Sequence, residues 1–264
     1  ITLFSDDSKI QRKPKGHLYL YPLIAIAAML AIVFVMDLPH MHKPKQQWSQ
    51  TIRIPAGQRA QMDLPDGSIV WLNSQTTLTY DENFGKKDRK VTLDGEAYFE
   101  VAHNKEIPFY VQTENIKVQV TGTKFDVCSY KGSNSFIARL IEGSINLLTN
   151  NAKEEKPITS LTKGKYFSME NGKYKTGEMS SNNALAWMQG IYYFDDVPFK
   201  ELLDKIALYY NYKITVKNPK ILENYRCTGK FKDLDGIEHI LKVIQKDHPF
   251  KYNIDNEHNK ITIE

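Results

Sequence analysis

The feature that most constrains the fold is a run of nineteen uncharged residues, Leu18 to Met36, which reads LYLYPLIAIAAMLAIVFVM between polar flanks. A helix needs roughly 20 apolar residues to cross a hydrocarbon core about 30 Å thick. The run therefore predicts a transmembrane helix over residues 18–38. It leaves a basic stub at residues 1–17, a linker at residues 39–49 and a long polar tail.

The charges around this run predict its orientation. The stub contains Lys9, Arg12, Lys13 and Lys15, and the positive-inside rule places such a segment in the cytoplasm. A cleaved signal peptide is the alternative, but its apolar core is usually only about 7–15 residues long and ends at a small-x-small site. Here Asp-Leu-Pro-His follows the run. We therefore expect a single-pass anchor with the tail on the far side.

Charge and cysteine content exclude some classes of protein. The formal net charge is +4, and the excess of Lys and Arg lies within residues 1–45, whereas the tail is balanced. No basic stripe is available for a phosphate backbone, so we expect no nucleic-acid partner. The two cysteines, Cys128 and Cys227, fall in different predicted domains. We expect two buried thiols rather than a disulfide.

The first part of the tail, residues 50–178, has the period-two pattern of β-strands. Apolar and polar residues alternate through many short runs, and turn signals such as Pro65-Asp66-Gly67 and Asp94-Gly95 separate them. No helical periodicity of ten residues or more occurs in this range. The pattern predicts an all-β sandwich, barrel or short solenoid, in which Trp71 and Leu72 make core and neighbouring-strand contacts and Gly95 allows a bend or bulge.

The second part, residues 184–264, predicts a small α+β sandwich with the order β-α-β-β-α-β-β. Apolar residues recur at helical spacing from Phe199 to Tyr210 and from Ile237 to Ile244. Asp196 is a candidate cap of the first helix, with Pro198 in its first turn. Asp235 and Glu238 form a D-x-x-E capping box for the second. The junction between the two parts is expected between Asn150 and Asn183.

Five motifs in the first part carry a family resemblance: LPDGSIVWLNSQTTLTY, VTLDGEAYFEV, PFYVQT, VQVTGTKFDV and LIEGSI. Their succession, over about residues 50–150, resembles the periplasmic domain of FecR-type transmembrane sensors, which regulate extracytoplasmic-function sigma factors. The second part is similar to the C-terminal domain that accompanies FecR domains, through AWMQGIYYFDDVPFKELLDKIALYYNYKI, RCTGKF and FKYNIDNEHNKITI.

The resemblance implies an inner-membrane signal transducer with residues 39–264 in the periplasm. Its C-terminal domain would contact the N-terminal signalling domain of an outer-membrane TonB-dependent transporter. A cytoplasmic region upstream of Ile1 would hold the sigma factor, and the start at Ile rather than Met suggests a fragment or a processed form. The alternative is a membrane-anchored periplasmic scaffold that binds glycans or proteins, and an enzyme of unknown type is a third possibility.

Two sets of residues are candidates for chemistry or binding. The resemblance implies that the bond between Gly122 and Thr123 can cleave itself, since a Thr hydroxyl can attack the preceding carbonyl carbon and Gly permits a strained backbone. The sequence identifies no base for this step. The candidate partner-binding residues belong to an aromatic-rich surface beside an exposed strand edge: Tyr192, Tyr193, Tyr209, Tyr210 and Arg226.

Other chemistry finds little support. His40 and His42 are too few for a metal site, and His103, His239 and His248 are scattered. No hydrolase, metalloprotease, phosphate-loop or Cys-x-x-Cys motif is present. We therefore predict no metal, no cofactor and no turnover enzyme.

Overall fold

The structure is a computed structural model that describes residues 20–37, 48–86, 88–150, 155–179 and 182–264. It divides into two units, residues 1–47 and residues 48–264. The predicted basic stub, most of the linker, and His40 and His42 lie outside the described residues.

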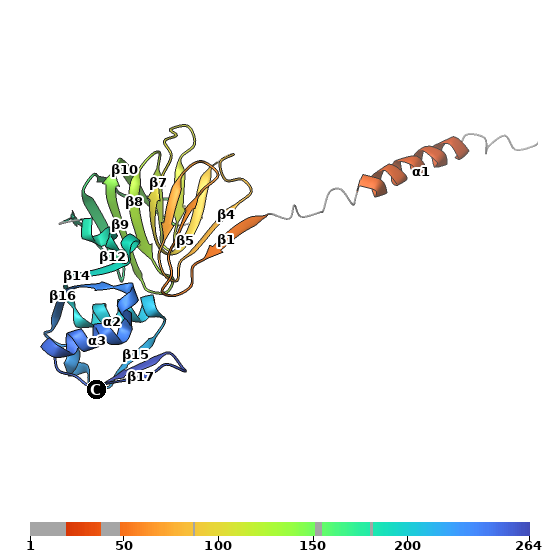
Figure 1. The fold of residues 1–264 in the computed structure, drawn as a ribbon. Coiled ribbons are helices and arrows are strands. Elements are labelled where there is room, and N and C mark those ends of the chain that lie inside the picture. Colours follow the sequence, from red (N-terminus) through yellow and green to blue (C-terminus); the bar gives the residue numbers. More distant parts are fainter. Residues whose placement is uncertain (1–19, 38–47, 87, 151–154, 180–181) are drawn as a thin grey trace, which may run out of the picture. The chain divides into compact units, whose positions relative to one another are not determined.

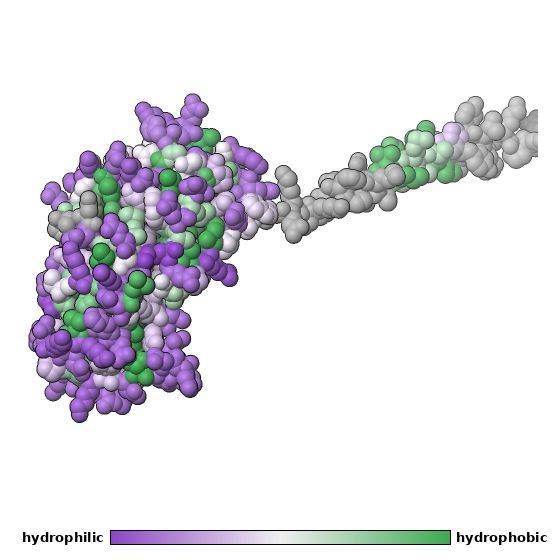
Figure 2. All heavy atoms as spheres, viewed as in Figure 1, coloured by the Kyte–Doolittle hydropathy of each residue, from purple (hydrophilic) through white to green (hydrophobic). Residues whose placement is uncertain are grey.

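In the first unit the apolar run forms helix α1 (Leu20–Asp37). Apolar side chains such as Ile24, Met29 and Phe34 are exposed along it, and Figure 2 shows hydrophobic residues at its surface. Across the described residues, the structure holds no helix that combines the length and the apolarity needed to cross a membrane.

Residues 48–179, which we call the β domain, form one thirteen-stranded sheet that curves as a half-barrel (Figure 1). No α-helix occurs in the described part of this range, so the prediction of an all-β domain is confirmed. The strands are β1 (Ser49–Arg53), β2 (Ala60–Asp63), β3 (Ile69–Leu72), β4 (Thr77–Asp81), β5 (Arg89–Glu100), β6 (Phe109–Gln112), β7 (Ile116–Val120), β8 (Lys124–Ser129), β9 (Ser135–Glu142), β10 (Ser144–Thr149), β11 (Pro157–Thr162), β12 (Lys165–Glu170) and β13 (Lys173–Glu178).

Strand β5 joins the two halves of this sheet. Its first half pairs with β4 and, in parallel, with β6. From Gly95 onward it pairs with β8 and β3. The prediction of a turn at Asp94-Gly95 is therefore wrong, whereas the predicted bend at Gly95 is present: its φ is +132°, and a Cβ there would overlap Thr76. Glycine is needed because β5 must change direction where another strand end lies against it.

The core lies on the concave face of the β domain. The alternating apolar positions of β5, β8 and β9 point into it, and the largest fully buried side chains there are Phe99, Phe109, Phe125, Phe136 and Phe167. The opposite positions of these strands, which carry charged and aromatic residues, face outward from this core. That outward face becomes important at the contact with the C-terminal domain.

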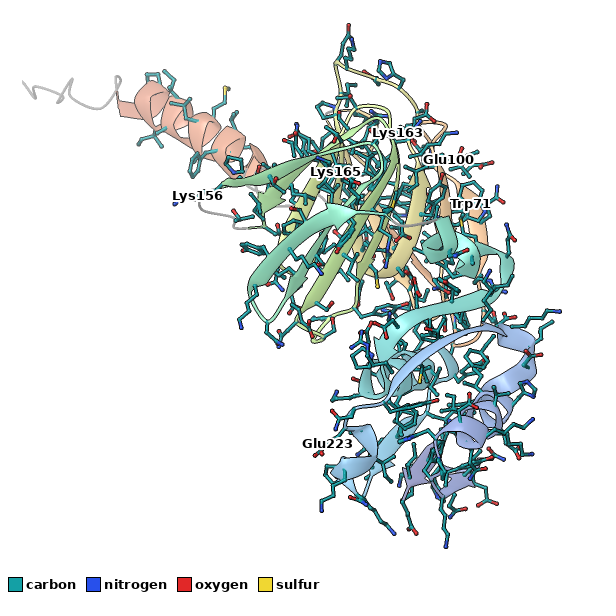
Figure 3. All side chains as sticks on the ribbon, turned by 90° about the vertical axis from the view of Figure 1, so that its left-hand side faces the viewer. Trp71, Glu100, Lys156, Lys163, Lys165 and Glu223 are labelled. Carbon is teal, nitrogen blue, oxygen red and sulfur yellow. The ribbon has the colours of Figure 1, made fainter. Side chains whose placement is uncertain are left out.

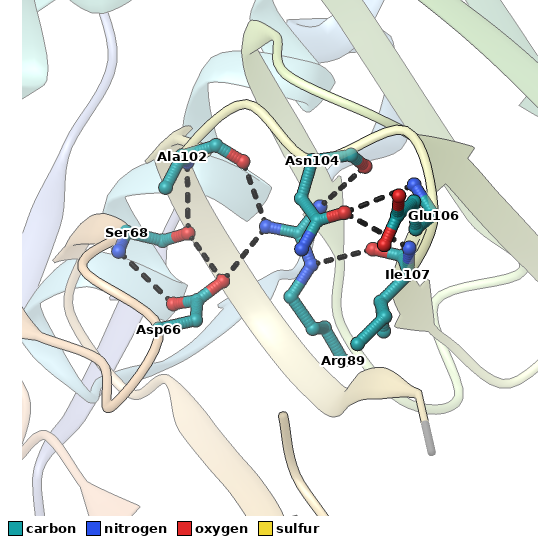
Figure 4. Close-up of polar contacts among 7 residues, drawn as sticks. All are labelled: Asp66, Ser68, Arg89, Ala102, Asn104, Glu106 and Ile107. Carbon is teal, nitrogen blue, oxygen red and sulfur yellow. Dashed lines mark hydrogen bonds and ion pairs between the residues drawn. The ribbon is translucent and has the colours of Figure 1, made fainter. Parts of the chain in front are cut away.

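Arg89, at the start of β5, holds a compact ionic cluster inside the β domain (Figure 4). Its Nη1 donates to the Asp66 carboxylate at 3.0 Å and to the Ala102 carbonyl at 2.7 Å. Nε donates to the Ile107 carbonyl at 2.8 Å, and Nη2 to that of Asn104 at 3.3 Å. The guanidinium is 2% exposed. Its charge is balanced, and each of its three nitrogens donates to the protein.

The Asp66 side of this cluster fixes the predicted hairpin turn between β2 and β3. The carboxylate accepts from the Ser68 amide at 2.9 Å and from the Ser68 hydroxyl at 2.8 Å. Gly67 has φ +82°, which is the left-handed conformation that a tight turn of this kind requires. The predicted role of Asp66-Gly67 is confirmed.

Residues 182–264, the C-terminal domain, have the predicted order of elements. Two helices pack between a two-stranded antiparallel sheet, β14–β16, and a three-stranded sheet, β15–β18–β17, in which β15 and β18 run parallel. The elements are β14 (Ile191–Pro198), α2 (Phe199–Tyr210), β15 (Lys213–Val216), β16 (Arg226–Lys232), α3 (Gly236–Asp247), β17 (Tyr252–Asp255) and β18 (Lys260–Ile263), with short 3₁₀ turns η1 (Asn182–Gln189), η2 (Pro219–Leu222) and η3 (Asp233–Asp235).

The helices bury the predicted stripes. The predicted cap of α2 is wrong, whereas Asp235 is the N-cap residue of α3 as predicted but makes no side-chain hydrogen bond to that helix. Pro198, not Asp196, is the N-cap of α2, and no side chain caps this helix. Asp196 lies in a bulge of β14 with φ +47° and binds Arg226 instead. Asp235 makes no side-chain cap for α3, because its carboxylate accepts from the Lys232 amide at 3.2 Å. In both cases the carboxylate binds a residue of β16 and not the backbone of the helix.

Candidate functional site

The Gly122–Thr123 bond lies in the loop between β7 and β8. Thr123 is buried, and its hydroxyl donates to the Ser144 carbonyl at 3.0 Å. Gly122 has no positive φ, so the strain expected there is absent. Glycine is required for another reason: a Cβ at this position would overlap the ring and backbone of His103. The structure thus places an imidazole, which the sequence could not assign, beside the candidate bond.

Most of the predicted partner-binding tyrosines point inward. Tyr192 is 3% exposed and stacks on Tyr209, with ring centroids 4.2 Å apart. The Tyr210 hydroxyl donates to the Asp233 carbonyl at 2.9 Å. These three side chains belong to the apolar cluster of the C-terminal domain, and they do not form the solvent-facing surface that the sequence suggested.

The other two predicted residues flank an open strand edge. Tyr193 is half-buried and lies under the Lys230 ammonium, which is 5.2 Å from its ring centroid, and Arg226 is exposed and pairs with Asp196 at 2.7 Å. Among the described residues, β16 pairs only with β14, so its other edge is unpaired. The exposed side of β16 carries Arg226, Thr228, Lys230 and Lys232.

The β domain and the C-terminal domain contact each other through the end of α2. The Ser74 hydroxyl and the Gly57 amide both donate to the Tyr209 carbonyl, at 2.9 and 3.0 Å, and the Gln75 amide donates to the Leu208 carbonyl. The last carbonyls of a helix have no partner within the helix. Asn211, in the left-handed conformation, is the C-cap of α2 and its N–H donates to the Leu208 carbonyl. The β domain adds donors to the last carbonyls of the helix.

Aromatic residues extend this contact on either side. Trp71 and Tyr98 of the β domain, whose rings lie 5.5 Å apart, join the apolar cluster of the C-terminal domain together with Trp187 of η1. Trp71 is thus a contact residue rather than a core residue of the β domain, which corrects the sequence prediction. Figure 3 shows Trp71 on the side of the β domain that faces η1. An ion pair between Arg59 and Asp233, 2.6 Å long, closes the same contact.

A second ionic cluster lies at the centre of this contact. Arg139 of β9 is 2.6 Å from the Asp126 carboxylate of β8 and 3.8 Å from the Glu96 carboxylate of β5. Asn73 donates to Glu96 at 2.6 Å. Asp126 and Glu96 are buried. Glu96 and Arg139 border a cavity of about 220 Å³ whose other wall is formed by Trp187, Tyr192, Lys205 and Tyr209 of the C-terminal domain.

Burial changes the acidity of these groups. Desolvation and, next, the neighbouring Asp126 carboxylate raise the pKa of Glu96, whereas Arg139 and the hydrogen bond from Asn73 lower it, and the net result is a pKa of about 7. Desolvation also raises the pKa of Asp126, against the effects of Arg139 and of Trp187. Where two carboxyl groups face one guanidinium in a buried site, ionisation of the second carboxyl group costs free energy. Proton binding is therefore a property of the pair.

Both domains match models of known protein families. The model of the FecR protein family matches residues 50–146, and the model of the FecR C-terminal domain matches residues 191–263. Together they cover well over half of the chain. The chain belongs to the FecR family.

Solved structures agree on the fold of this FecR protein. Two crystal structures from Parabacteroides distasonis, at 2.50 and 1.65 Å resolution and described as a "putative anti-sigma factor", match with a TM-score of 0.69 at 24% identity. The matches cover 82% and 81% of this chain and 98% of theirs. At this identity the likeness establishes the fold alone. A search of the curated proteins gives no significant match.

The two cysteines of this FecR protein are unpaired. Burial raises the pKa of the Cys128 thiol well above its usual value, and Glu96 raises it further. Burial likewise raises the pKa of Cys227. Both thiols are therefore poor nucleophiles. Cys227 is buried as expected, whereas the residue Cys128 is only partly buried.

Glu96, Asp126 and Arg139 are not among the site residues predicted from the sequence, although two of them lie within the motifs of the FecR resemblance. Each alternates with core residues, as in Phe125-Asp126-Val127 and Ala138-Arg139-Leu140. Strand alternation assigns such residues to solvent. One signal was present in the sequence: acidic and basic residues occupy the outward positions of three strands. Only the order of the strands in the sheet shows that these residues are neighbours.

Proposed function

We propose that this FecR protein is the signal-receiving part of an inner-membrane transducer that controls an extracytoplasmic-function sigma factor. The observation that carries the proposal is the presence of both FecR domains, in order, on one chain behind an apolar helix. The C-terminal domain rests on the β domain through one side and leaves the β16 edge unpaired on another. A receptor needs such a divided surface, with one part for the partner and one for the rest of the chain.

The anchor would be the apolar run that includes α1, with the stub in the cytoplasm and residues 39–264 in the periplasm. The exposed apolar side chains of α1 favour this role, since a helix that is hydrophobic on all sides requires a nonaqueous surrounding. Alkaline extraction of membranes tests it: the full chain should stay in the pellet. Release into the supernatant, as for a peripheral protein, would contradict the anchor.

The partner in the periplasm would be the N-terminal signalling domain of an outer-membrane TonB-dependent transporter. An unpaired strand edge can accept a strand of a partner by main-chain hydrogen bonds, and β16 offers one. The sigma factor would bind a cytoplasmic region upstream of Ile1. Transporter binding can alter sigma-factor release only if its affinity differs between two states of the receptor.

The test is cross-linking in intact cells with the tagged full chain, followed by mass spectrometry of the recovered proteins. We expect a TonB-dependent transporter that carries a signalling domain. The double change Lys230→Glu and Lys232→Glu on β16 should abolish its recovery, whereas Lys163→Glu with Lys165→Glu, on the β11–β12 side of the β domain (Figure 3), should not. Recovery of cell-wall material without a transporter would favour the alternative of an anchored scaffold.

Self-cleavage between Gly122 and Thr123 remains a separate prediction. The Thr123 hydroxyl would have to leave the Ser144 carbonyl, to which it donates, before it could attack the Gly122 carbonyl carbon. The attack would break the Gly122–Thr123 amide bond as an ester forms, the hydroxyl proton would pass to the freed amine, and water would then hydrolyse the ester. A denaturing gel of the full chain should then show two fragments, and Thr123→Ala should give one intact band. A single intact band from the unaltered protein would rule cleavage out.

A further inference from the structure

The contact between the two FecR domains brings an indole donor to a buried carboxylate. Oδ1 of Asp126, on the β domain, and the indole N–H of Trp187, on η1, are both buried and have no other hydrogen-bond partner. Hydrogen bonding from Trp187 lowers the pKa of Asp126, so the two atoms are partners across the contact. A buried carboxylate depends on such donors, because without them its charge costs free energy. Separation of the domains would replace this indole donor by water.

The charges at this contact are also unbalanced. The groups that face Glu96 and Asp126 come from every element packed around them: Cys128 of β8, Tyr130 after β8, Arg139 of β9, Tyr192 of β14, Lys205 and Tyr209 of α2 and Trp187 of η1. Only Arg139 forms an ion pair with these acids among the described residues. Lys205 pairs with Glu201 at 2.8 Å. Two buried acids thus share one bound cation, and a single proton would complete the balance.

We propose that this contact is a proton-coupled latch, in which the C-terminal domain stays seated on the β domain while the Glu96–Asp126 pair holds one proton and separates more readily once that proton passes to water. The acids lie on the outward face of β5 and β8, and residues of the C-terminal domain, Trp187 and Tyr209 among them, face Glu96 across the cavity. Separation would hydrate both carboxylates. The latch does not depend on the identity of any binding partner, and it is independent of the proposed sigma-factor control.

The direction of the effect follows from proton linkage. In the seated state burial holds the pKa of Glu96 at about 7, whereas a hydrated glutamate has a pKa of about 4.3. The seated state therefore binds the extra proton between these values. The equilibrium constant for seating should fall by up to about tenfold per pH unit from pH 5 to pH 7, and should level off above pH 7.

The test uses the full chain in detergent with Trp48→Phe and Trp71→Phe, which leaves Trp187 as the only tryptophan. Acrylamide quenching of Trp187 along a urea series reports separation of the domains, and far-UV circular dichroism reports loss of the sheet. We expect Trp187 to become accessible before the sheet is lost. The urea midpoint of this exposure should fall as pH rises from 5 to 7 and stay constant from 7 to 8.5.

Two variants in this background separate the latch from a general effect of pH. Glu96→Gln keeps the size of the side chain but cannot ionise, so its midpoint should be high and independent of pH. Glu100→Gln alters a partly exposed acid four residues further along β5 and should behave as the parent. A midpoint that does not change with pH in the parent overturns the latch. So does a pH dependence that survives Glu96→Gln, or an exposure of Trp187 that always coincides with loss of the sheet.

Discussion

Strand β5 carries two buried ionic clusters that differ in what surrounds them. Around Arg89, one cation meets one carboxylate and three backbone carbonyls of the same domain, and each guanidinium nitrogen donates a hydrogen bond. Around Glu96, two carboxylates meet one cation, and Trp187 of the other domain is a hydrogen-bond donor to Asp126. The first cluster lies within the β domain, whereas the second lies between domains.

The difference indicates what each cluster does. A balanced buried cluster holds neighbouring segments in one arrangement, because removal of any member leaves a buried charge. A cluster that lacks one positive charge is stable only with a proton or with water, so its state depends on conditions. We therefore expect changes at Arg89 to affect stability at every pH, and changes at Glu96 to affect stability in a manner that depends on pH.

The largest effect is expected for Arg89→Ala. The change leaves Asp66 buried without its cation and strips the carbonyls of Ala102, Asn104 and Ile107 of a donor. We expect a loss of about 3–5 kcal/mol in the free energy of unfolding, measured by urea denaturation of the full chain. Arg226→Ala, which breaks an exposed ion pair, should cost less than about 1 kcal/mol. Equal losses would show that the Arg89 cluster is not special.

Gly95→Ala tests the bend of β5 between the two clusters. The new Cβ would overlap Thr76, and alanine would have to adopt φ +132°, so we expect a loss of about 2–4 kcal/mol. Gly132→Ala is the matched control, because that glycine has φ +77° with open space around it. It should cost about 1 kcal/mol. Thermal or urea unfolding of both variants decides whether the close approach at Thr76 matters.

Glu96→Gln should stabilise the protein at high pH only. Since burial raises the pKa of Glu96 to about 7, the folded state binds a proton that the unfolded state releases above about pH 4.3. The parent thus loses stability from about pH 4.3 to pH 7, and the variant does not. We expect the variant to be more stable by about 1–3 kcal/mol at pH 8 and nearly equal at pH 5. A variant less stable than the parent at pH 8 would contradict the uncompensated charge.

Arg59→Ala should have the smallest effect on unfolding. Its ion pair with Asp233 joins the two domains, but the Arg59 side chain is 25% exposed, and such pairs contribute roughly 1 kcal/mol or less. We expect easier quenching of Trp187 with the β sheet intact. Lys200→Ala, which breaks an exposed pair within α2, should leave quenching unchanged.

Most helices and strands of the fold could be predicted from the sequence, because the spacing of apolar residues within each element indicates its type. Strands β5, β8 and β9 and helices α2 and α3 each bury one face. Apolar residues therefore recur every second residue in these strands and at helical spacing in these helices. The parallel pairing of β15 with β18 is a contact between distant segments, and no local pattern encodes it. The prediction of a turn at Asp94-Gly95 was wrong because the same dipeptide also fits a bend within a long strand.

The site could not be predicted for a related reason. Glu96, Asp126 and Arg139 occupy the outward positions of their strands, where a charged residue normally meets water. They become buried because the C-terminal domain covers that face, and a period of two carries no information about a second domain. Tyr192 and Tyr209 show the converse: an aromatic-rich segment suggested a binding surface, but the two rings stack on each other, and Tyr192 is buried.

The most direct test is a carbon-13 NMR titration of the Glu96 carboxyl in the full chain between pH 4 and pH 9, assigned with Glu96→Gln. The contact described above predicts a midpoint near pH 7. A midpoint near the ordinary value of about 4.3 would mean that Glu96 is ionised throughout the physiological range. It would contradict both the shared proton and the contrast with Arg89.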